Sequence, residues 1–595
     1  MSLAPDSPDP PFDRVYHTLL GISRLADELT GKHPFSQGWN HSSALAEIKR
    51  ALLDREDPAF SLLQDEPPSE PLAHDSDFVE MIMGSLNIFS HVSEASTHRG
   101  NGSLSPLLRT IWPRIVLWTS VLHPCRGHLD RSGRLASHVS IARDVAVVGN
   151  AYLTITASDR LLVRQFFHSF PDAVLQICEL WLSYPKLISP KGLDSSSAAD
   201  SARCLINLMT QVFDILVHPS HNPTGADEEL FIRILRCAAG GSRFFLYAVM
   251  HQTDLLRALS MAHPLVAATW TAHFSLIYCI LGLERFERSS IPKGVIENVV
   301  ATALYCLESP DTQAEAVHAV HVVSLFCGMS NSSSAMVRAI DAGIFEVMRT
   351  ITSDPLYIIG GICHFLCAGL LRLRVVRAFC RRYRQPIDPA SLPEIAGQRS
   401  ELGSCRDVAR MANAARELYT ERYHDGAWKQ KLRCGNPMGP HNRDVRACPC
   451  AREFYCSGSC QRMDKMAHQV FCTEKDGPWA LRGVVSLADA MYICAAVIEH
   501  MQADYEAIAR SACKLLVKLK ESRLRTQIVV HFDLARVLPR VRHDVYARTG
   551  ASSAFMVCET VLVEVSLRVG RSTKTRVLPF TYSLKEFITS TKSKQ

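Results

Sequence analysis

Cysteine residues gather in one short part of this 595-residue chain. Six of its 20 cysteines fall between positions 434 and 472, where uniform scatter would place only about one. They are Cys434, Cys448, Cys450, Cys456, Cys460 and Cys472. Thiolates at such spacings, together with imidazole, are the usual ligands of a tetrahedral Zn²⁺. We therefore expect residues 434–472 to bind zinc.

The second half of this segment has the most informative spacing. Cys456 and Cys460 are four residues apart, and so are His468 and Cys472. Residues at positions i and i+4 of a helix point the same way, so we expect His468 and Cys472 to project from one side of one helix. About 40 residues with few apolar side chains cannot build a core alone, and the metal is expected to stabilise their fold.

The remaining fourteen cysteines are predicted to be core residues or free thiols. The first twelve residues have no basic and apolar segments typical of a secretory signal, so we expect an intracellular, reducing location, in the cytoplasm or the nucleus. Seven of the fourteen lie within apolar helical patterns, where a thiol behaves as a small hydrophobic group. These are Cys178, Cys237, Cys279, Cys306, Cys327, Cys363 and Cys367.

The run Tyr455-Cys456-Ser457-x2-Cys460-Gln461, followed by His468-x3-Cys472, resembles a MYND-type zinc finger, and the layout of the chain is similar to that of fungal proteins with this finger. The resemblance covers residues 434–472 and implies two zinc ions bound in crossed order. It assigns one ion to Cys448, Cys450, His468 and Cys472. It assigns three ligands of the other ion to Cys434, Cys456 and Cys460.

The first ligand pair of the resembled family is incomplete here. Gly439 stands where family members of the C-x-N-P-x-C type have their second cysteine. His441 or a water molecule would have to complete the site of Cys434. The pair Cys448-Pro-Cys450 is also one residue tighter than usual. We expect one firmly bound zinc ion and a second, weaker one.

The resemblance also implies a peptide-binding side on the finger, formed by Tyr455, Ser457, Gln461 and Lys465. Family members have a Trp at the position of Lys465, where its ring is a wall for proline-containing peptides. A lysine there would weaken stacking against proline and favour acidic residues in the peptide. The expected partner is therefore another protein or a short proline-containing peptide.

No catalytic motif accompanies the finger. The sequence has no phosphate-binding loop, nucleophile elbow or metalloprotease helix motif. The 123 residues after Cys472 are too few for the catalytic core of a SET methyltransferase, which accompanies this finger in some proteins. We expect a non-enzymatic adaptor. An uncharacterised enzyme is the alternative, and it would require titratable residues that converge in space.

A basic cluster precedes the finger. Its six members are Arg372, Arg374, Arg377, Arg381, Arg382 and Arg384. The cluster could bind phosphate or an acidic tail, or it could be a solvated helix face. The net charge of +6 is small for 595 residues, and no known nucleic-acid-binding module is present, which argues against nucleic acid as the partner. A regulatory, nucleic-acid-associated factor is kept as the second alternative.

The elements that must position these residues are mainly helices. Amphipathic segments of about 10–20 residues, separated by short polar breaks, fill residues 76–424. Clear examples are 78–93, 107–122, 173–182, 202–217, 230–238, 295–307 and 316–326. Residues 335–351 predict two helices that meet at Gly343, as in an armadillo repeat. We expect a mainly α protein with an irregular helical array, either an armadillo-like solenoid or a bundle.

The two ends of the chain differ from this array. Residues 1–75 contain an acidic, proline-rich run and are expected to form a mostly flexible arm with one helix near 44–53. Residues 480–595 predict a small α+β module, with a helix over 484–521 and strands at 528–534, 561–569 and 577–582, the last two as a β-hairpin. The apolar stretches 265–283 and 356–371 are interpreted as buried helices and not as membrane spans.

Overall fold

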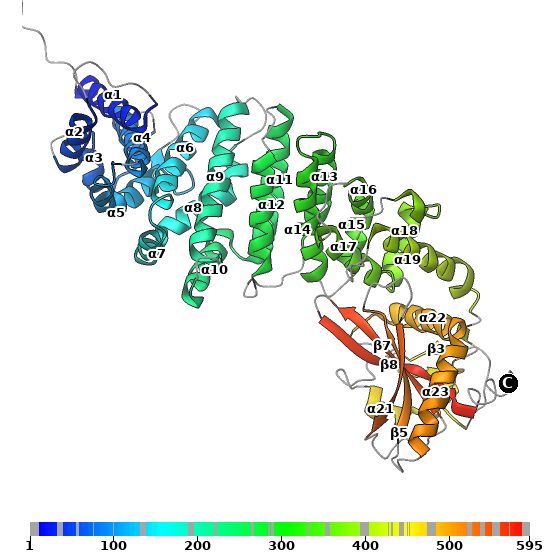
Figure 1. Ribbon diagram of the computed structural model, residues 1–595. Helices are drawn as coiled ribbons and strands as arrows, with labels where there is room; N and C mark the ends of the chain where they lie inside the picture. The colour runs from blue at the N-terminus through cyan, green and yellow to red at the C-terminus, as the bar shows by residue number, and fades with distance from the viewer. Residues whose placement is uncertain are drawn as a thin grey trace, which may run out of the picture. The chain divides into compact units, whose positions relative to one another are not determined.

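Helices dominate the computed structural model, which separates into two compact units, residues 1–298 and 299–595 (Figure 1). The predicted helical array with a small sheet-containing C-terminal module is confirmed. The structure describes residues 11–32, 40–54, 59–74, 76–98, 100–130, 138–188, 195–218, 223–262, 267–283, 286, 291–329, 333–351, 357–392, 404–426, 428–429, 432, 434–438, 446–448, 450, 453–472, 484–520, 526–535, 542–549, 560–569 and 572–585.

The first unit is built from packed helices. A helix often contacts the third helix after it along the chain, as α1 does with α4, α6 with α9 and α9 with α12. This spacing is typical of arrays of three-helix repeats. The elements are α1 (Pro11–Thr30), α2 (His41–Leu53), α3 (Ser61–Gln64), β1 (Leu72–Ala73), α4 (Asp77–Thr97), α5 (Ser105–Leu122), β2 (Leu129–Asp130), α6 (His138–Thr156), α7 (Arg160–Ser169), α8 (Pro171–Leu187), α9 (Ser195–Leu216), α10 (Gly225–Ala239), α11 (Ser242–Ala262) and α12 (Ala267–Gly282).

The N-terminal 75 residues differ from the expected flexible arm. Helix α1 is 20 residues long and packs against α4. Its Leu19, Ile22, Ala26 and Leu29 are buried, and they recur at the three- and four-residue spacing of one helix face. This apolar face makes the segment part of the helical core, although its overall composition is polar. The expected helix near 44–53 is present as α2, which is capped by Asn40.

The helices of the second unit continue the same pattern, since α14 contacts α17 and α15 contacts α18. The predicted junction at Gly343 is confirmed: α15 ends and α16 begins at this glycine, whose φ of 101° is left-handed. Helix α13 (Val295–Leu307) spans the division between the units. The later helices are α14 (Ala316–Met329), α15 (Ser334–Ala342), α16 (Ile344–Thr350), α17 (Tyr357–Gly369), α18 (Leu373–Arg382), α19 (Cys405–Glu417), a π-helical turn η4 (Leu418–Tyr423), α20 (Gly458–Met463), α21 (Lys465–Cys472), α22 (Leu487–Ala503) and α23 (Tyr505–Lys520), with 3-10 turns η2 (Gln313–Glu315) and η3 (Pro389–Ser391).

The two strongly apolar segments of the sequence form α12 and α17. Trp270, Phe274 and Ile277 of α12 are buried, as are Ile362 and Leu366 of α17. In the described part of the chain, no helix combines the length and the apolar character needed to cross a membrane.

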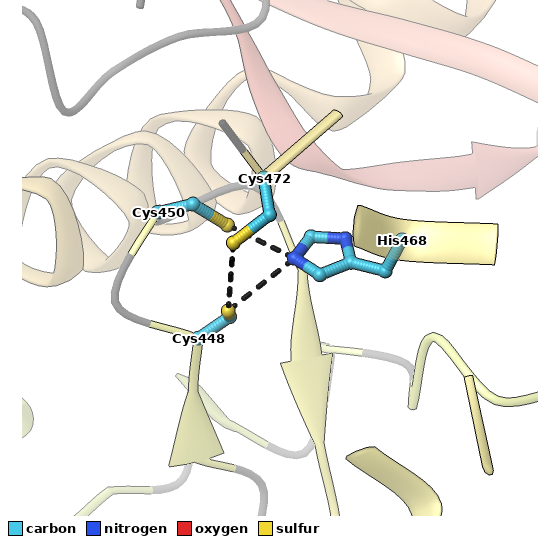
Figure 2. Close-up of side chains that lie close together, drawn as sticks. All are labelled: Cys448, Cys450, His468 and Cys472. Atoms are coloured by element: carbon cyan, nitrogen blue, oxygen red, sulfur yellow. Dashed lines mark hydrogen bonds between the residues drawn. The ribbon is translucent and has the colours of Figure 1, made fainter. Parts of the chain in front are cut away.

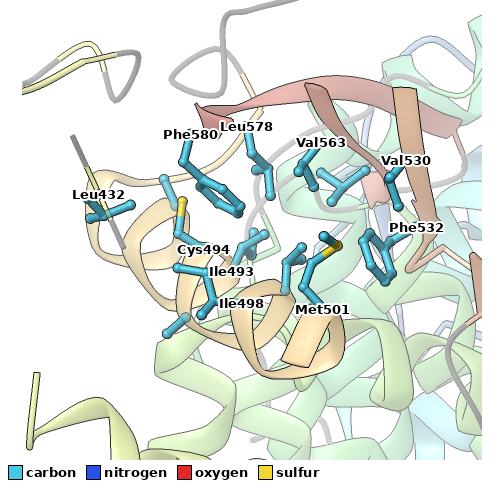
Figure 3. Close-up of a cluster of buried hydrophobic side chains, with 14 of the residues drawn as sticks. Leu432, Ile493, Cys494, Ile498, Met501, Val530, Phe532, Val563, Leu578 and Phe580 are labelled. Carbon is cyan, nitrogen blue, oxygen red and sulfur yellow. The ribbon is translucent and has the colours of Figure 1, made fainter. Parts of the chain in front are cut away.

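The C-terminal module is a four-stranded sheet in the order β6-β5-β7-β8, covered on one face by α22. Strands β7 and β8 form the predicted antiparallel hairpin, and β5 runs parallel to β7. Ile493, Ile498 and Met501 of α22 share a core with Val530 and Phe532 of β5 (Figure 3). The strands are β5 (Thr526–Asp533), β6 (Arg542–Thr549), β7 (Thr560–Val569) and β8 (Ser572–Ser583).

The end of the helical array packs directly on this module. The backbone N–H of Leu373, at the start of α18, donates to Asp489 Oδ1 of α22 over 2.8 Å. The Arg372 guanidinium, the first of the predicted basic cluster, donates to the carbonyl oxygens of Val484 and Arg568 at 3.3 and 3.4 Å. Arg372 therefore stabilises the fold and is not part of a free basic surface.

Candidate metal centre

A short hairpin and two helices bring the clustered cysteines together. Strands β3 (Arg446–Ala447) and β4 (Phe454–Tyr455) pair antiparallel, and the Cys448 N–H donates to the Glu453 carbonyl over 2.8 Å. This hairpin holds Cys448 and Cys450 at its turn and Cys456 just beyond its second strand. Helices α20 and α21 follow and carry the remaining ligands of the segment.

The first group of ligands is complete within the described residues (Figure 2). His468 Nε2 lies 3.3 Å from the sulfurs of both Cys448 and Cys450, and Cys448 Sγ lies 3.9 Å from Cys472 Sγ. Two sulfurs bound to one tetrahedral zinc at about 2.3 Å would be separated by about 3.8 Å. The four side chains therefore have the spacing of a tetrahedral site, and the expected projection of His468 and Cys472 from one helix, α21, is observed.

The second group contains Cys434, Cys456 and Cys460, whose sulfurs lie within 4.8 Å of one another. Cys456 and Cys460 are the closest pair, at 3.5 Å. Ser457 caps α20 by accepting from the Cys460 N–H over 3.1 Å, so the cap fixes both cysteines. His441, the expected fourth ligand, and Gly439 lie outside the described residues.

The two groups take their ligands in crossed order along the chain. Cys448 and Cys450 combine with His468 and Cys472, while Cys434, which precedes them, combines with Cys456 and Cys460. The chain therefore passes three times between the two groups. This is the grouping that the resemblance to the MYND finger implies. Each group could hold one metal ion.

Hydrogen bonds and a close backbone approach support the thiolates. The Gln461 amide donates to Cys448 Sγ at 3.9 Å, although Gln461 follows Cys460 of the other group. Hydrogen bonds, first from Ser457 and then from Asn436, lower the pKa of the Cys460 thiol. Gly435 donates its N–H to the Phe454 carbonyl over 2.8 Å, and a Cβ there would lie 2.7 Å from the Glu453 carboxylate. A larger residue after Cys434 would therefore require the Glu453 side chain to move.

The four expected peptide-binding residues occupy different environments. Tyr455 is buried, and its hydroxyl donates to Asp464 Oδ2 over 2.5 Å, so it supports the finger from inside. Ser457 is half-buried at the cap of α20. Gln461 and Lys465 are exposed. The surface that the structure offers therefore contains Gln461 and Lys465 but not Tyr455.

Three exposed methionines on the finger were not expected from the sequence. Met438, Met463 and Met466 are 82%, 60% and 82% exposed. Asn436 donates to the Met463 sulfur at 3.8 Å, which places the turn before Met438 next to α20. We call Met438, Met463 and Met466 the methionine patch. The spacing of Met463 and Met466, three residues apart beside Lys465, was the only signal for it in the sequence.

Cysteines outside the finger follow the expected pattern with two exceptions. Cys178, Cys306, Cys327, Cys363 and Cys367 are buried. Burial raises the pKa of the Cys178 thiol and raises the pKa of Cys306 and of Cys327 to about 12, which keeps these thiols protonated. Cys237 is exposed and Cys279 is half-buried. The prediction that these two residues belong to the core is therefore wrong.

The chain was compared with protein-family models, with curated proteins and with solved structures. None of the three comparisons gave a match.

Proposed function

We propose that this chain is a zinc-binding adaptor protein whose finger is of the MYND type. The crossed ligand grouping carries the proposal, because unrelated cysteines that happen to be close in sequence would pair with their nearest neighbours. The donor set of three thiolates and one imidazole suits Zn²⁺ better than Mg²⁺ or Ca²⁺, which prefer oxygen ligands. The cysteines within the described residues carry free thiols, which favours an intracellular compartment.

The role of the metal is structural. Four protein ligands in the first group fill a tetrahedral ion and leave no position for a reactive water molecule. Such an ion crosslinks the hairpin and α21, and it supplies the stability that a finger of this size lacks. An adaptor therefore explains the site better than a hydrolytic enzyme.

The exposed side of α20 and α21 is the proposed docking surface of the finger. The methionine patch offers flexible apolar contacts that adapt to different partners. Lys465 lies between Met463 and Met466, and no carboxylate among the described residues pairs with it. The fitting ligand is a proline-containing peptide with acidic residues near the proline, supplied by a partner protein.

Metal content is the first test. Purified, reduced protein loaded with zinc is expected to keep at least one ion per chain after dialysis, with a second ion lost earlier. Cys450→Ser should remove the firm ion, whereas Cys178→Ser, which changes a buried thiol in α8, should leave the zinc content unchanged. Elemental analysis measures both. Less than about half an equivalent of zinc in the unchanged protein would refute the finger.

Peptide binding is the second test. The full chain is titrated with fluorescent proline-rich 12-residue peptides, one neutral and one acidic. The acidic peptide should bind more tightly, and Lys465→Trp should reverse the preference. Met466→Ser should weaken the binding of both peptides by about two- to fivefold, as expected for the loss of a small exposed apolar contact. Leu161→Ser, which changes an exposed apolar side chain on α7, is the matched control. Equal, tight binding of the neutral peptide by the unchanged and Lys465→Trp proteins would contradict this role of Lys465.

A further inference from the structure

Helix α18 carries an exposed row of arginines that the metal site does not use. Arg374, Arg377 and Arg381 recur at positions i, i+3 and i+7 and are exposed, and Arg384 follows just after the helix. The opposite face of α18 is buried through Val375, Val376, Phe379 and their neighbours. Because the opposite face of α18 is packed in the core, the helix backbone holds the arginines on its exposed face.

Ion pairs divide these arginines into two sets. Arg381 donates to both oxygens of Asp341 at 2.7 Å, and Arg382 lies 2.8 Å from Glu346 Oε1. By contrast, no carboxylate in the described parts of the chain forms an ion pair with Arg374, Arg377 or Arg384. We call these three residues the unpaired arginine row. Their positive charge is not neutralised by the groups that neutralise Arg381 and Arg382.

An aromatic group holds the middle member of the row. The Arg377 guanidinium lies over the Tyr419 ring, 5.8 Å from its centroid, and Arg377 Nε donates to the Tyr419 hydroxyl over 3.2 Å. Tyr419 also packs against Tyr423 at 6.4 Å and His424 at 4.8 Å between ring centroids. A guanidinium stacked in this way loses less side-chain freedom when it binds an anion, because its position is already fixed.

We infer that the unpaired arginine row binds an acidic peptide segment of a partner protein. Planar guanidinium groups match carboxylates through paired N–H···O bonds. The row consists of three arginines, and the neighbouring Arg381 of the same helix is already paired with Asp341. A nucleic acid needs a broader basic field than three unpaired arginines provide. The Tyr419 ring is already covered by Arg377, Tyr423 and His424, so it offers no platform for a base.

This surface is separate from the finger and does not depend on its metal. The arginine row and the peptide-binding surface of the finger share no residue, so a variant of one site leaves the residues of the other unchanged. A carboxylate-rich ligand bound at α18 should be indifferent to changes at Lys465 and Met466. A partner with one acidic segment and one proline-containing segment would engage the chain at both places.

The test uses the full chain and a fluorescent 12-residue peptide of glutamate and serine, with a 12-nucleotide single-stranded RNA as the competing class of ligand. The double variant Arg374→Gln/Arg377→Gln should weaken peptide binding at least about tenfold, as expected for the loss of charged hydrogen bonds. The control is Arg203→Gln/Arg410→Gln. It removes the same net charge from two exposed arginines that pair with Asp200 and Asp407, and it should change binding less than about twofold.

The outcomes separate the explanations. A thermal unfolding curve and a zinc content equal to those of the unchanged protein show that each variant is folded. Equal losses in the two double variants would mean that only net charge matters, and the proposed surface would be wrong. Tighter binding of the RNA than of the peptide, lost in Arg374→Gln/Arg377→Gln, would make the row a nucleic-acid surface and overturn the proposal. Failure of the unchanged protein to bind the peptide would also overturn it.

Discussion

At the scale of residues, the side-chain amide of Gln461 connects the two groups of candidate metal ligands. Gln461 directly follows Cys460 of the second group and donates to Cys448 of the first. A thiolate that accepts such a hydrogen bond has part of its negative charge stabilised by the donor, and the bond also orients the thiolate toward the metal. Gln461 has two interpretations, as a peptide contact and as a support of the metal site. The structure provides a geometric basis for the second, which spacing alone could not reveal.

The fourth ligand of the second group can be tested by substitution. We expect His441→Ala to accelerate the loss of one zinc ion to a chelator, because Cys434, Cys456 and Cys460 would then hold it with three protein ligands. Cys472→Ala should instead release the other ion. Release is followed with a colorimetric zinc indicator. Metal retention by His441→Ala equal to that of the parent would leave water as the better fourth ligand.

At the scale of elements, the chain depends on sharp helix junctions, and Gly343 is the clearest. Gly343 is the C-terminal cap of α15 and also the N-terminal cap of α16, and its φ is 101°. A side chain in this conformation costs about 1–2 kcal/mol. A Cβ at Gly343 would also lie 3.2 Å from the ends of Arg382 and Glu346, which form an ion pair.

Gly343→Ala is therefore expected to destabilise the second unit by about 1–2 kcal/mol. Gly21→Ala is the matched control, because Gly21 lies inside α1 and a Cβ there would meet nothing within 4 Å. That change should raise stability by about 0.5–1 kcal/mol, since alanine favours a helix over glycine. Urea unfolding measures both. A loss at Gly343 no larger than the change at Gly21 would argue against strain at the junction.

Periodicity explains which elements could be predicted. Helices such as α4, α5 and α14 bury a continuous face, and β7 and the second half of β8 are apolar, so their patterns are visible in the sequence. Strand β6 was missed because it is an edge strand whose residues are charged or half-buried. Backbone pairing with β5 stabilises this strand, although the residues of β6 do not favour a strand by themselves. Helix α1 was missed for a related reason: its apolar stripe lies in a segment of polar composition.

The ligand types could be predicted from the sequence because zinc prefers thiolates and imidazoles, whereas their crossed grouping came from the resemblance to the MYND finger. Surface properties could not be predicted in the same way. Tyr455 was expected outside, yet its ring packs near His468, 5.9 Å between centroids, and its hydroxyl binds Asp464. An amphipathic tyrosine can satisfy its hydroxyl inside or outside, and only the three-dimensional position of Asp464 decides between them.

At the scale of the whole molecule, the finger and the C-terminal module share one core within the second unit. Cys448, Phe454 and Tyr455 belong to the same buried cluster as Ile493 of α22 and Val563 of β7. The finger is therefore less independent than its sequence boundaries, 434–472, suggest. Metal ions held by the two groups would therefore stabilise more than the finger, and the module packs against the ligand residues.

A comparison of two fragments tests this dependence. Residues 425–480 contain the finger alone, whereas residues 404–595 also contain α19, α22, α23 and the sheet. We expect the shorter fragment to release zinc to a chelator at least about tenfold faster, because loss of the shared apolar contacts costs more than about 1.4 kcal/mol. Similar release rates from both fragments would show that the finger folds and holds metal without the module.

The sheet order has a consequence for synthesis of the chain. Strand β5 takes its place only between β6 and β7, and β7 pairs with β8, which ends at Ser583. The parallel pair of β5 and β7 cannot form until β7, which ends at Val569, has left the ribosome, and pairings distant in sequence form slowly. The finger ends at Cys472 and emerges earlier than β7, so its thiols are still uncovered at that stage. Its cysteines therefore pass through a vulnerable interval in which the supply of metal, and not the finished fold, determines whether they are captured or oxidised.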